Sequence, residues 1–279
     1  MATMPLARHK PARASVLMYH RVAAAGVFDF SLDAWNVAPG RLEQQLQWLA
    51  KNADCRPLAE AMQERPPAGR QRPVVALTFD DGYANFHHAV LPLLKRYQIP
   101  ATLFVVTRHV SSSEPYPFDR WGQKNRARTA PIAWRPITWA ELEDCLNSNL
   151  VSIGSHSHDH LNALYASDQQ LADEAQVSRE ILTGRFGAER ASLYAYPYGA
   201  SRLGQVRAAY VEAVRAAGYR LAVTTDLGLV QPETAPFLIP RLEVHAYDSP
   251  RILQAKVCGH LWPQRLGDQC RQAKRHSNP

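Results

Sequence analysis

Short apolar segments with many β-branched residues alternate with amphipathic helical patterns along most of this chain. Five segments have the length and composition of buried strands: residues 15–20, 74–79, 101–106, 151–154 and 221–224. Helical periodicity between them predicts helices over residues 41–51, 86–97, 138–147, 168–186 and 204–217. This alternation favours an α/β fold with a parallel sheet, either open or closed into a barrel. The length of 279 residues allows one large domain or two small ones.

Two of these helices carry capping signals at their ends. Thr138 and Glu141 have the spacing of a capping box, which predicts that a helix begins at this point. Gly218 follows the last periodic residue of the 204–217 segment, and it predicts the end of that helix because glycine readily adopts a left-handed conformation.

The positive charge of the chain is concentrated at its two ends. The net charge is +7 and the pI is about 9.4, values that first suggest a nucleic acid or an anionic membrane as partner. Residues 1–21 carry +4 and residues 265–279 carry +3, whereas residues 22–264 balance, with 24 basic and 24 acidic side chains. Because the basic residues are not organised over the body of the chain, we expect no nucleic-acid partner.

The spacing of the cysteines and the hydropathy of the chain limit further the class of protein to which it can belong. The four cysteines (Cys55, Cys145, Cys258 and Cys270) form no closely spaced pair, so we expect free thiols rather than a disulfide framework or a cysteine zinc site. No segment reaches the roughly 18 consecutive apolar residues of a membrane helix, and the first residues lack the apolar core of a signal peptide. These features predict a cytoplasmic protein.

Two adjacent carboxylates follow one of the predicted strands directly. Asp80 and Asp81 come after the 74–79 segment, and parallel strands deliver such residues to the carboxyl end of the sheet, where α/β folds place their sites. Neighbouring side chains at a strand end point in different directions, so one carboxylate can bind a cation while the other acts as a base. Gly82 permits the sharp exit that such a site needs. A solvated turn is the alternative interpretation of this motif taken alone.

A histidine cluster follows the 151–154 segment. His156 and His160 have i,i+4 spacing, which in a helical turn places both imidazoles on one side. Two histidines and one carboxylate leave an open position on a zinc-type ion, a pattern typical of catalytic metal sites. His158 would face elsewhere. A histidine cluster taken alone more often binds no metal, but its pairing with Asp80 and Asp81 favours a metal site.

Three motifs in order give the chain a family resemblance. Residues 78–82 (Thr-Phe-Asp-Asp-Gly), His156-Ser157 with His160, and residues 196–199 (Tyr-Pro-Tyr-Gly) resemble the first three motifs of the polysaccharide deacetylase family. This family is also called carbohydrate esterase family 4 or the NodB homology domain. The resemblance extends from about residue 15 to residue 245.

The resemblance implies a deformed (β/α) barrel, in a single domain, that hydrolyses N-acetyl groups on sugars. It implies that Asp81, His156 and His160 bind a divalent metal, with Zn²⁺ favoured over Co²⁺, Ni²⁺ or Mn²⁺. It further implies that Asp80 is the general base and that the backbone N–H of Tyr198, after Pro197, faces the developing oxyanion.

The sequence departs from the family pattern at several positions. The third motif usually carries an arginine that orients the catalytic base, but Ala195 occupies that position, and Arg241 is our candidate replacement. An ordinary structural ion pair is the alternative role for Arg241. The Asp-Trp pair of the fourth motif is also absent, since only Asp226 occurs there, and we expect Asp226 to be structural.

The general acid of the family is expected near the amino-terminal end of this chain and not near its carboxyl-terminal end. A carboxyl-terminal Leu-x-His strand is not obvious, and the segment that ends in His20 resembles its equivalent in the circularly permuted branch of the poly-N-acetylglucosamine deacetylases. His20 would then protonate the leaving amine. His245 is the competitor for this role, and we prefer His20 because it directly ends an apolar strand.

The resemblance makes an acetylated amino sugar, in a glycan or a glycoconjugate precursor, the expected substrate. The connection 107–136 is too long for an ordinary loop, and it interleaves aromatic residues with Arg120, Lys124, Arg126, Arg128 and Arg135. Trp121 and Trp134 are candidates for stacking on a sugar ring, with packing as a close rival, and Pro197 is a further candidate substrate contact. The arginines of this loop suggest a phosphate-linked substrate, although a solvated rim explains them equally well.

Two other functions remain open from the sequence. A protein of this fold could remove an O-acetyl or N-formyl group, or could bind glycans without catalysis, and the missing arginine at Ala195 gives the second idea some weight. We expect basic tails at 1–14 and 264–279 to flank a catalytic domain at 15–263. These tails suggest weak peripheral contact with an anionic membrane, or simply solubility.

Overall fold

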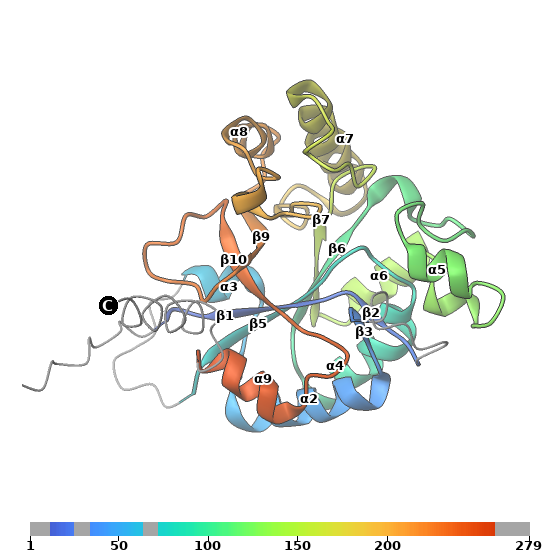
Figure 1. Cartoon of the computed structure of the whole chain (residues 1–279), viewed down its shortest axis with the longest axis vertical. Coiled ribbons are helices and arrows are strands. Elements are labelled where there is room, and N and C mark those ends of the chain that lie inside the picture. The colour runs from blue at the N-terminus through green and yellow to red at the C-terminus, as the bar shows by residue number, and fades with distance from the viewer. Residues whose placement is uncertain (1–11, 25–33, 64–71, 260–279) are drawn as a thin grey trace, which may run out of the picture.

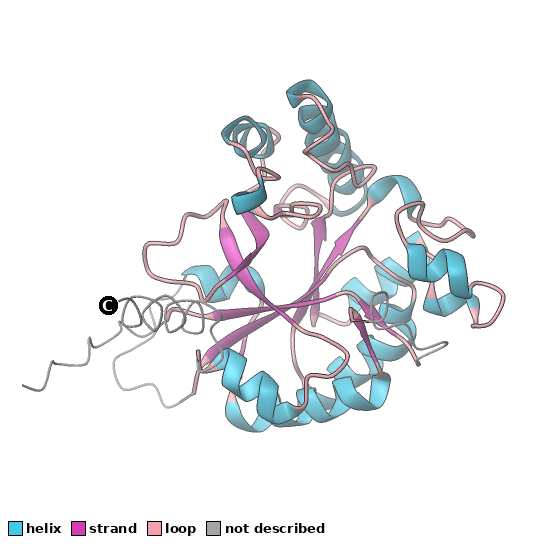
Figure 2. Ribbon diagram, viewed as in Figure 1, coloured by secondary structure: helices cyan, strands magenta, loops and turns pink. Residues whose placement is uncertain are grey.

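The computed structural model describes residues 12–24, 34–63 and 72–259. A ring of parallel strands forms its centre, and helices surround this ring (Figure 1; Figure 2). The strands are β1 (Ser15–Tyr19), β2 (Arg21–Val22), β3 (Asn36–Val37), β4 (Asp54–Cys55), β5 (Val74–Phe79), β6 (Ala101–Val105), β7 (Val151–Ser155), β8 (Leu193–Ala195), β9 (Leu221–Leu227) and β10 (Ile239–Glu243).

Hydrogen bonds close seven of these strands into a barrel. The main sheet has the order β1-β10-β9-β8-β7-β6-β5-β4, and β1 also pairs with β5, so that β1 closes the ring. All these pairs are parallel, with Leu17 opposite Leu77 on one side and opposite Leu242 on the other. All strands of the ring therefore end at the same rim, which we call the carboxyl rim.

The helices lie outside the strands. They are α2 (Pro39–Asn52), α3 (Leu58–Gln63), α4 (Leu91–Tyr97), α5 (Arg120–Asn125), α6 (Trp139–Asn147), α7 (Asp168–Phe186), α8 (Ala208–Ala216) and α9 (Pro250–Val257), with a π-helix η1 (Phe86–Val90) and three short 3₁₀ turns, η2 (Thr107–His109), η3 (Pro131–Ala133) and η4 (Ser201–Leu203). Helices α2 and α9 pack on one side of the barrel, and α7 and α8 pack together on the opposite side (Figure 1).

The strands are buried on both faces, which explains their continuous apolar sequences. Every residue of β1, β5 and β6 is buried. The largest apolar cluster joins Leu17, Leu77 and Leu103 in the barrel to Leu46 of α2 and Leu253 of α9. None of the helices in the described part of the chain is both long and apolar enough to cross a membrane.

Most predicted elements agree with the structure, and two of the predicted helices differ. The capping box of Thr138 and Glu141 is present, and α7 has the predicted bounds. The predicted helix 204–217 begins only at Ala208, because Gly204 takes a left-handed conformation (φ 78°) after η4. The predicted helix 86–97 begins as the π-helix η1 before continuing as α4.

The long connection 107–136 is ordered rather than an open loop. It contains η2, α5 and η3, and Asp119 caps α5 by accepting a hydrogen bond from the backbone N–H of Gly122. The predicted tails at residues 1–14 and 264–279 lie almost entirely outside the described residues. Arg21, which contributes to the basic amino-terminal end, is buried and pairs with Asp119, so it does not belong to a free basic tail.

Close packing between β7 and β6 gives a stability prediction for a buried glycine. A Cβ atom at Gly154 would lie 2.4 Å from the ring of Phe104 and 3.0 Å from the carbonyl oxygen of Leu193. We expect Gly154→Ala to lower the free energy of unfolding by about 1–3 kcal/mol through overpacking. Urea denaturation followed by circular dichroism measures the change.

Gly184 of α7 provides the matched control, because a Cβ atom there would meet nothing within 4 Å. We expect Gly184→Ala to leave stability unchanged or to raise it by up to about 1 kcal/mol through helix propensity. Equal effects of the two substitutions would contradict the packing argument.

Candidate active site

A cavity of about 360 Å³ opens at the carboxyl rim of the barrel. Most of its residues come from the ends of β1, β5, β7, β8, β9 and β10 and from the connection 107–136, and Arg21 of β2 and Trp35 before β3 complete it. Those that line it are Met18, His20, Arg21, Trp35, Asp80, Asp81, Tyr83, Phe118, Asp119, Arg120, Trp121, His156, His160, Tyr198, Thr225 and Glu243. The size suits a small ligand or one unit of a larger one.

The structure brings together the three residues that the sequence predicts as metal ligands. His156 Nε2 lies 3.5 Å and His160 Nε2 lies 3.6 Å from Asp81 Oδ1. All three side chains are at least nine-tenths buried. His156 donates from Nδ1 to the carbonyl oxygen of Ala195 at 2.8 Å, which fixes the tautomer that leaves Nε2 free to bind a metal.

The electrostatics of this cluster fit a bound cation. Burial and the neighbouring Asp80 raise the pKa of Asp81 to about 8, so the carboxylate is poorly stabilised without a positive partner. Burial, reinforced by His156, holds the pKa of His160 well below its usual value, so this imidazole is neutral. Two neutral imidazoles and one carboxylate form the donor set of an open zinc-type site.

The segment that carries the two histidines is an irregular loop and not the helical turn that their spacing predicts. Ser157 and His160 have positive φ values of 64° and 61°. Side-chain oxygens replace the helical hydrogen bonds here. Ser157 Oγ accepts from the N–H of His160, and the Glu174 carboxylate of α7 accepts from the N–H groups of His158 and Asp159. In this loop the ring centroids of His156 and His160 lie 4.8 Å apart.

A buried ion pair fixes the second carboxylate. Arg241 of β10 donates from Nη1 to Asp80 Oδ1 and from Nη2 to Asp80 Oδ2, both at 2.7 Å. Arg241 also donates from Nε to the carbonyl oxygen of Thr224 and from Nη1 to Thr78 Oγ1. Burial raises the pKa of Asp80, but the Arg241 guanidinium outweighs it and holds that pKa well below its usual range. Asp80 is therefore ionised and oriented.

His20 lines the cavity, and His245 does not. His20 follows β1, and its ring packs 4.9 Å from that of Trp35. Trp35 also packs against His245, with the ring centroids 4.9 Å apart, and His245 stacks on Tyr247. Burial, opposed by the charge of Asp80, lowers the pKa of His20 to about 4. The imidazole of His20 is therefore neutral at pH 7.

The third motif forms a strained turn after β8. Tyr198 has a φ of 60°, and its ring lies 4.9 Å from that of His160. Gly199 is required here, since its φ is 47° and a Cβ atom would lie 2.7 Å from the carbonyl oxygen of Tyr196. Pro197 is buried within the turn and does not line the cavity, so the structure shows no surface on it for a substrate.

Positive φ values gather at this site. Among the described residues seven non-glycine residues have them, and four of the seven are Asp81, Ser157, His160 and Tyr198. Each costs on the order of 1–3 kcal/mol, and such strain is found where function demands a particular geometry. Tyr116 helps hold Asp81 in place, because its hydroxyl donates to the carbonyl oxygens of Asp81 and Gly82 at 2.6 and 3.0 Å.

The connection 107–136 closes one side of the cavity. Phe118 stacks on His160 with the ring centroids 3.8 Å apart. The buried ion pair of Arg21 with Asp119 fastens this connection to β2, and the Arg21 guanidinium lies 4.3 Å from the ring centroids of Tyr83 and Trp121. These contacts place Phe118 and Asp119 at the cavity.

The two candidate stacking tryptophans are packing residues in this structure. Trp121 is 2% exposed and Trp134 is 6% exposed, and both belong to one small apolar cluster. Trp121 lines the cavity, but Arg21 covers its ring, whereas Trp134 does not line the cavity at all. The structure thus provides no open ring face for a sugar at Trp134.

Known proteins resemble this chain in sequence and in fold. A family model described as "Polysaccharide deacetylase" matches residues 68–222, more than half of the chain. The chain belongs to the polysaccharide deacetylase family. It is similar to a poly-beta-1,6-N-acetyl-D-glucosamine N-deacetylase of Staphylococcus aureus (strain MRSA252), with 24% identity over 253 residues that cover 84% of this chain and 80% of the relative.

Two solved structures share the fold. IcaB from Ammonifex degensii has a TM-score of 0.70 at 22% identity, over 89% of this chain and 98% of that one. The Streptococcus pyogenes deacetylase PplD, solved in complex with acetate, has a TM-score of 0.68 at 21% identity, over 88% of this chain and 97% of that one. The predicted (β/α) barrel is confirmed.

Several residues that shape the site of this polysaccharide deacetylase are not evident from its sequence. They include Trp35, Phe118 and Asp119 in the cavity wall and Glu174 beneath the histidine loop. Glu174 does carry a signal, since it is an acidic residue on the buried face of α7, between Leu171 and Ser178. The others have no local signal, because only the tertiary fold brings them to the site.

The Arg241–Asp80 pair gives a stability prediction. Arg241→Gln leaves a carboxylate buried without its partner, so we expect the free energy of unfolding to fall by about 3–5 kcal/mol. Adding Asp80→Asn removes that charge, so the double variant is expected to be more stable than Arg241→Gln alone. Urea denaturation of the four proteins of this cycle measures the coupling.

Arg215→Gln serves as the control. Its ion pair with Glu212 is an exposed i,i+3 contact on α8, and we expect a loss within about 0.5 kcal/mol. A loss for Arg241→Gln no larger than that of Arg215→Gln would contradict the assigned role of the buried pair.

Proposed function

We propose that this enzyme removes N-acetyl groups from an amino sugar in a glycan or a glycoconjugate precursor, and that it needs a divalent metal to do so. The observation that carries the proposal is the juxtaposition of two carboxylates with different partners. Asp81 lies with His156 and His160, while Asp80 is held by Arg241 in the same cavity. Membership of the polysaccharide deacetylase family supports this reading of the site.

Asp81, His156 and His160 are the residues that would hold the metal. When bound, a divalent ion supplies Lewis acidity, which polarises the acyl oxygen and lowers the pKa of water. The imidazole-rich donor set favours Zn²⁺, with Co²⁺, Ni²⁺ and Mn²⁺ as alternatives. His156 is preorganised for this role by its hydrogen bond to Ala195.

Asp80 is proposed as the general base that takes a proton from the attacking water. The two hydrogen bonds from Arg241 orient its carboxylate and keep it ionised. Arg241 would thus do what the arginine missing at Ala195 does in the family pattern. This intact pair favours an enzyme over a glycan-binding protein without activity.

His20 is proposed to protonate the leaving amine. It lines the cavity, whereas His245 does not line it and packs instead against Trp35 and Tyr247. Burial lowers the pKa of this imidazole and holds it neutral at pH 7, so the proton that His20 gives to the leaving amine must reach it during the catalytic cycle. The backbone N–H of Tyr198, in the strained turn after β8, is the proposed donor to the developing oxyanion.

The nature of the acetylated substrate is the least determined part of the proposal. The relative from Staphylococcus aureus is named for a polymer of N-acetylglucosamine, which favours an N-acetylated amino sugar over an O-acetyl or N-formyl substrate. Of the basic residues in the connection, Arg120 lines the cavity, whereas Arg126 pairs with Glu114 and Arg135 pairs with Glu141. The idea of a phosphate-linked sugar therefore rests on Arg120 alone.

The substrate proposal is tested by acetate release from a panel of acetylated sugars with metal-loaded protein. We expect release from N-acetylglucosamine oligomers, and loss of at least about 100-fold in kcat for Asp80→Asn, because general-base catalysis contributes about that much or more. Metal content is expected to be unchanged in Asp80→Asn. Full activity of Asp80→Asn would contradict the assigned base, and equal kcat/KM for phosphorylated and unphosphorylated sugars would exclude a phosphate contact.

The choice of general acid is tested by comparing two histidine variants. We expect His20→Asn to lower kcat by about 100-fold or more with little change in KM, because the loss is one of proton transfer. His245→Asn, which removes a histidine that does not line the cavity, is the matched control and is expected to retain most activity. The opposite order would assign the acid to His245.

A further inference from the structure

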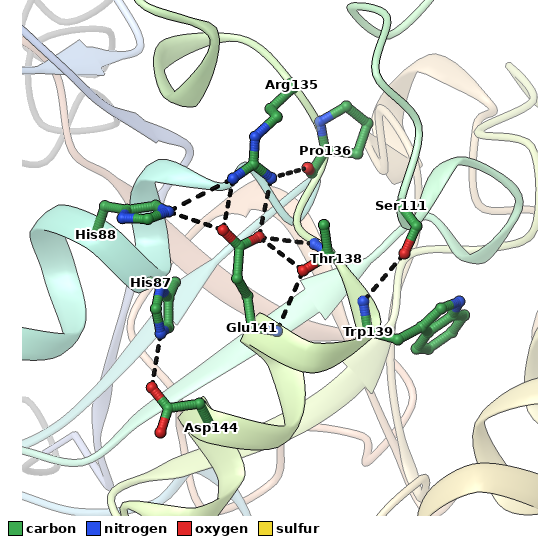
Figure 3. Close-up of polar contacts among 9 residues, drawn as sticks. All are labelled: His87, His88, Ser111, Arg135, Pro136, Thr138, Trp139, Glu141 and Asp144. Atoms are coloured by element: carbon green, nitrogen blue, oxygen red, sulfur yellow. Dashed lines mark hydrogen bonds and ion pairs between the residues drawn. The ribbon is translucent and has the colours of Figure 1, made fainter.

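A second cluster of metal-ligating side chains lies on the outside of the barrel, between η1 and α6. His87 and His88 of η1 face Glu141 and Asp144 of α6 (Figure 3). Three ligand atoms lie within 4.8 Å of one another here, one each from His87, His88 and Glu141. The catalytic cluster of Asp81 with His156 and His160 meets the same geometric description.

The carboxylates orient the two imidazoles in different ways. His88 Nε2 lies 2.7 Å from Glu141 Oε1, so these two atoms are already in contact. His87 Nε2 lies 2.6 Å from Asp144 Oδ2, which leaves its other nitrogen as the available ligand. His87 Nδ1 is buried and has no hydrogen-bond partner. A histidine held by a carboxylate through one nitrogen is the arrangement that supports metal binding by the other.

We propose that His87, His88 and Glu141 form a second metal site, with Asp144 as the residue that orients His87. Two imidazoles and one carboxylate suit Zn²⁺, Ni²⁺, Co²⁺ or Cu²⁺ and not Mg²⁺ or Ca²⁺, which prefer oxygen ligands. Ligand atoms on one zinc ion lie about 3.3 Å apart for bonds of about 2.0 Å. Small side-chain rotations therefore suffice to bring the three donors around an ion.

Arg135 makes this site weaker than the catalytic one. Its guanidinium donates to both oxygens of Glu141, at 2.5 Å to Oε1 and 2.9 Å to Oε2. Glu141 Oε2 is also held by the N–H and hydroxyl of Thr138, so Oε1 is the oxygen that an ion can share. The positive charge of Arg135 opposes a second cation at this distance. We infer that the site fills only when the metal is in excess of the catalytic centre.

An ion here would join segments that support the catalytic aspartates. The residues after Arg135 pair with those after Asp81: the N–H of Ile137 donates to the carbonyl oxygen of Gly82, and the N–H of Ala84 donates to that of Arg135. Crosslinking η1 to α6 would brace this pairing from outside the barrel. The site does not depend on the deacetylase proposal, because no residue of the cavity belongs to it.

The test is a calorimetric titration of the full chain with Zn²⁺ alone, after a chelator has removed any bound metal. We expect a weaker binding event in addition to that of the catalytic cluster, and its loss in both His88→Ala and Glu141→Gln. Glutamine at position 141 retains the capping-box geometry, so Glu141→Gln keeps the measurement valid if His88→Ala does not fold. Glu143→Gln, an exposed position on the same helix, is the matched control and should retain the event.

Two further variants give graded results. Asp144→Asn should weaken the event by about 10–100-fold, as is usual when the partner of a metal-binding histidine is lost. Arg135→Gln should tighten it several-fold by removing the competing charge. Absence of a weaker event at millimolar Zn²⁺, or its persistence in both His88→Ala and Glu141→Gln, would overturn the proposal. Persistence would instead place the event at other residues of the chain.

Discussion

The hydrogen bonding of β1 to both β5 and β10 is the constraint on which the rest of this structure depends. This strand closes the barrel, and it joins the beginning of the chain to segments about 60 and 220 residues further along. Because the pairing is parallel on both sides, His20, Asp80 and Arg241 all come to the carboxyl rim. Without the pairing of β1 with β5 the sheet would be open, and His20 and Arg241 would lie near one edge while Asp80 lay near the other.

Buried charge is the second organising feature. Asp80 with Arg241 and Asp119 with Arg21 are ion pairs removed from water, and each satisfies its donors and acceptors with further hydrogen bonds. Such pairs add little net stability compared with apolar packing, but they tolerate only a narrow geometry. Here one pair orients a carboxylate in the cavity, and the other fastens the connection 107–136 across it. In the described part of the chain no arginine or lysine pairs with Asp81, which is the carboxylate that we propose for the metal.

The sequence predicted the elements better than the contacts between them. Strand segments, the capping box at Thr138 and the bounds of α7 follow from local periodicity and local hydrogen bonding, and they agree with the structure. The meeting of His156 with His160 was expected from helical spacing, yet an irregular loop held by Glu174 produces it. Trp121 and Trp134 could not be assigned from sequence, because exposure depends on which surfaces the connection covers.

By itself the sequence determined the α/β alternation, the family motifs and the identity of the carboxylates and histidines that meet at the rim. These depend on residue types at short spacing, where backbone geometry leaves few alternatives. Only the tertiary structure decided that Arg241 reaches Asp80, that His20 lines the cavity while His245 does not, and that Arg21 is buried against Asp119. Those contacts join residues far apart in the chain, and closure of the barrel, a property of all its strands together, brings them within bonding distance.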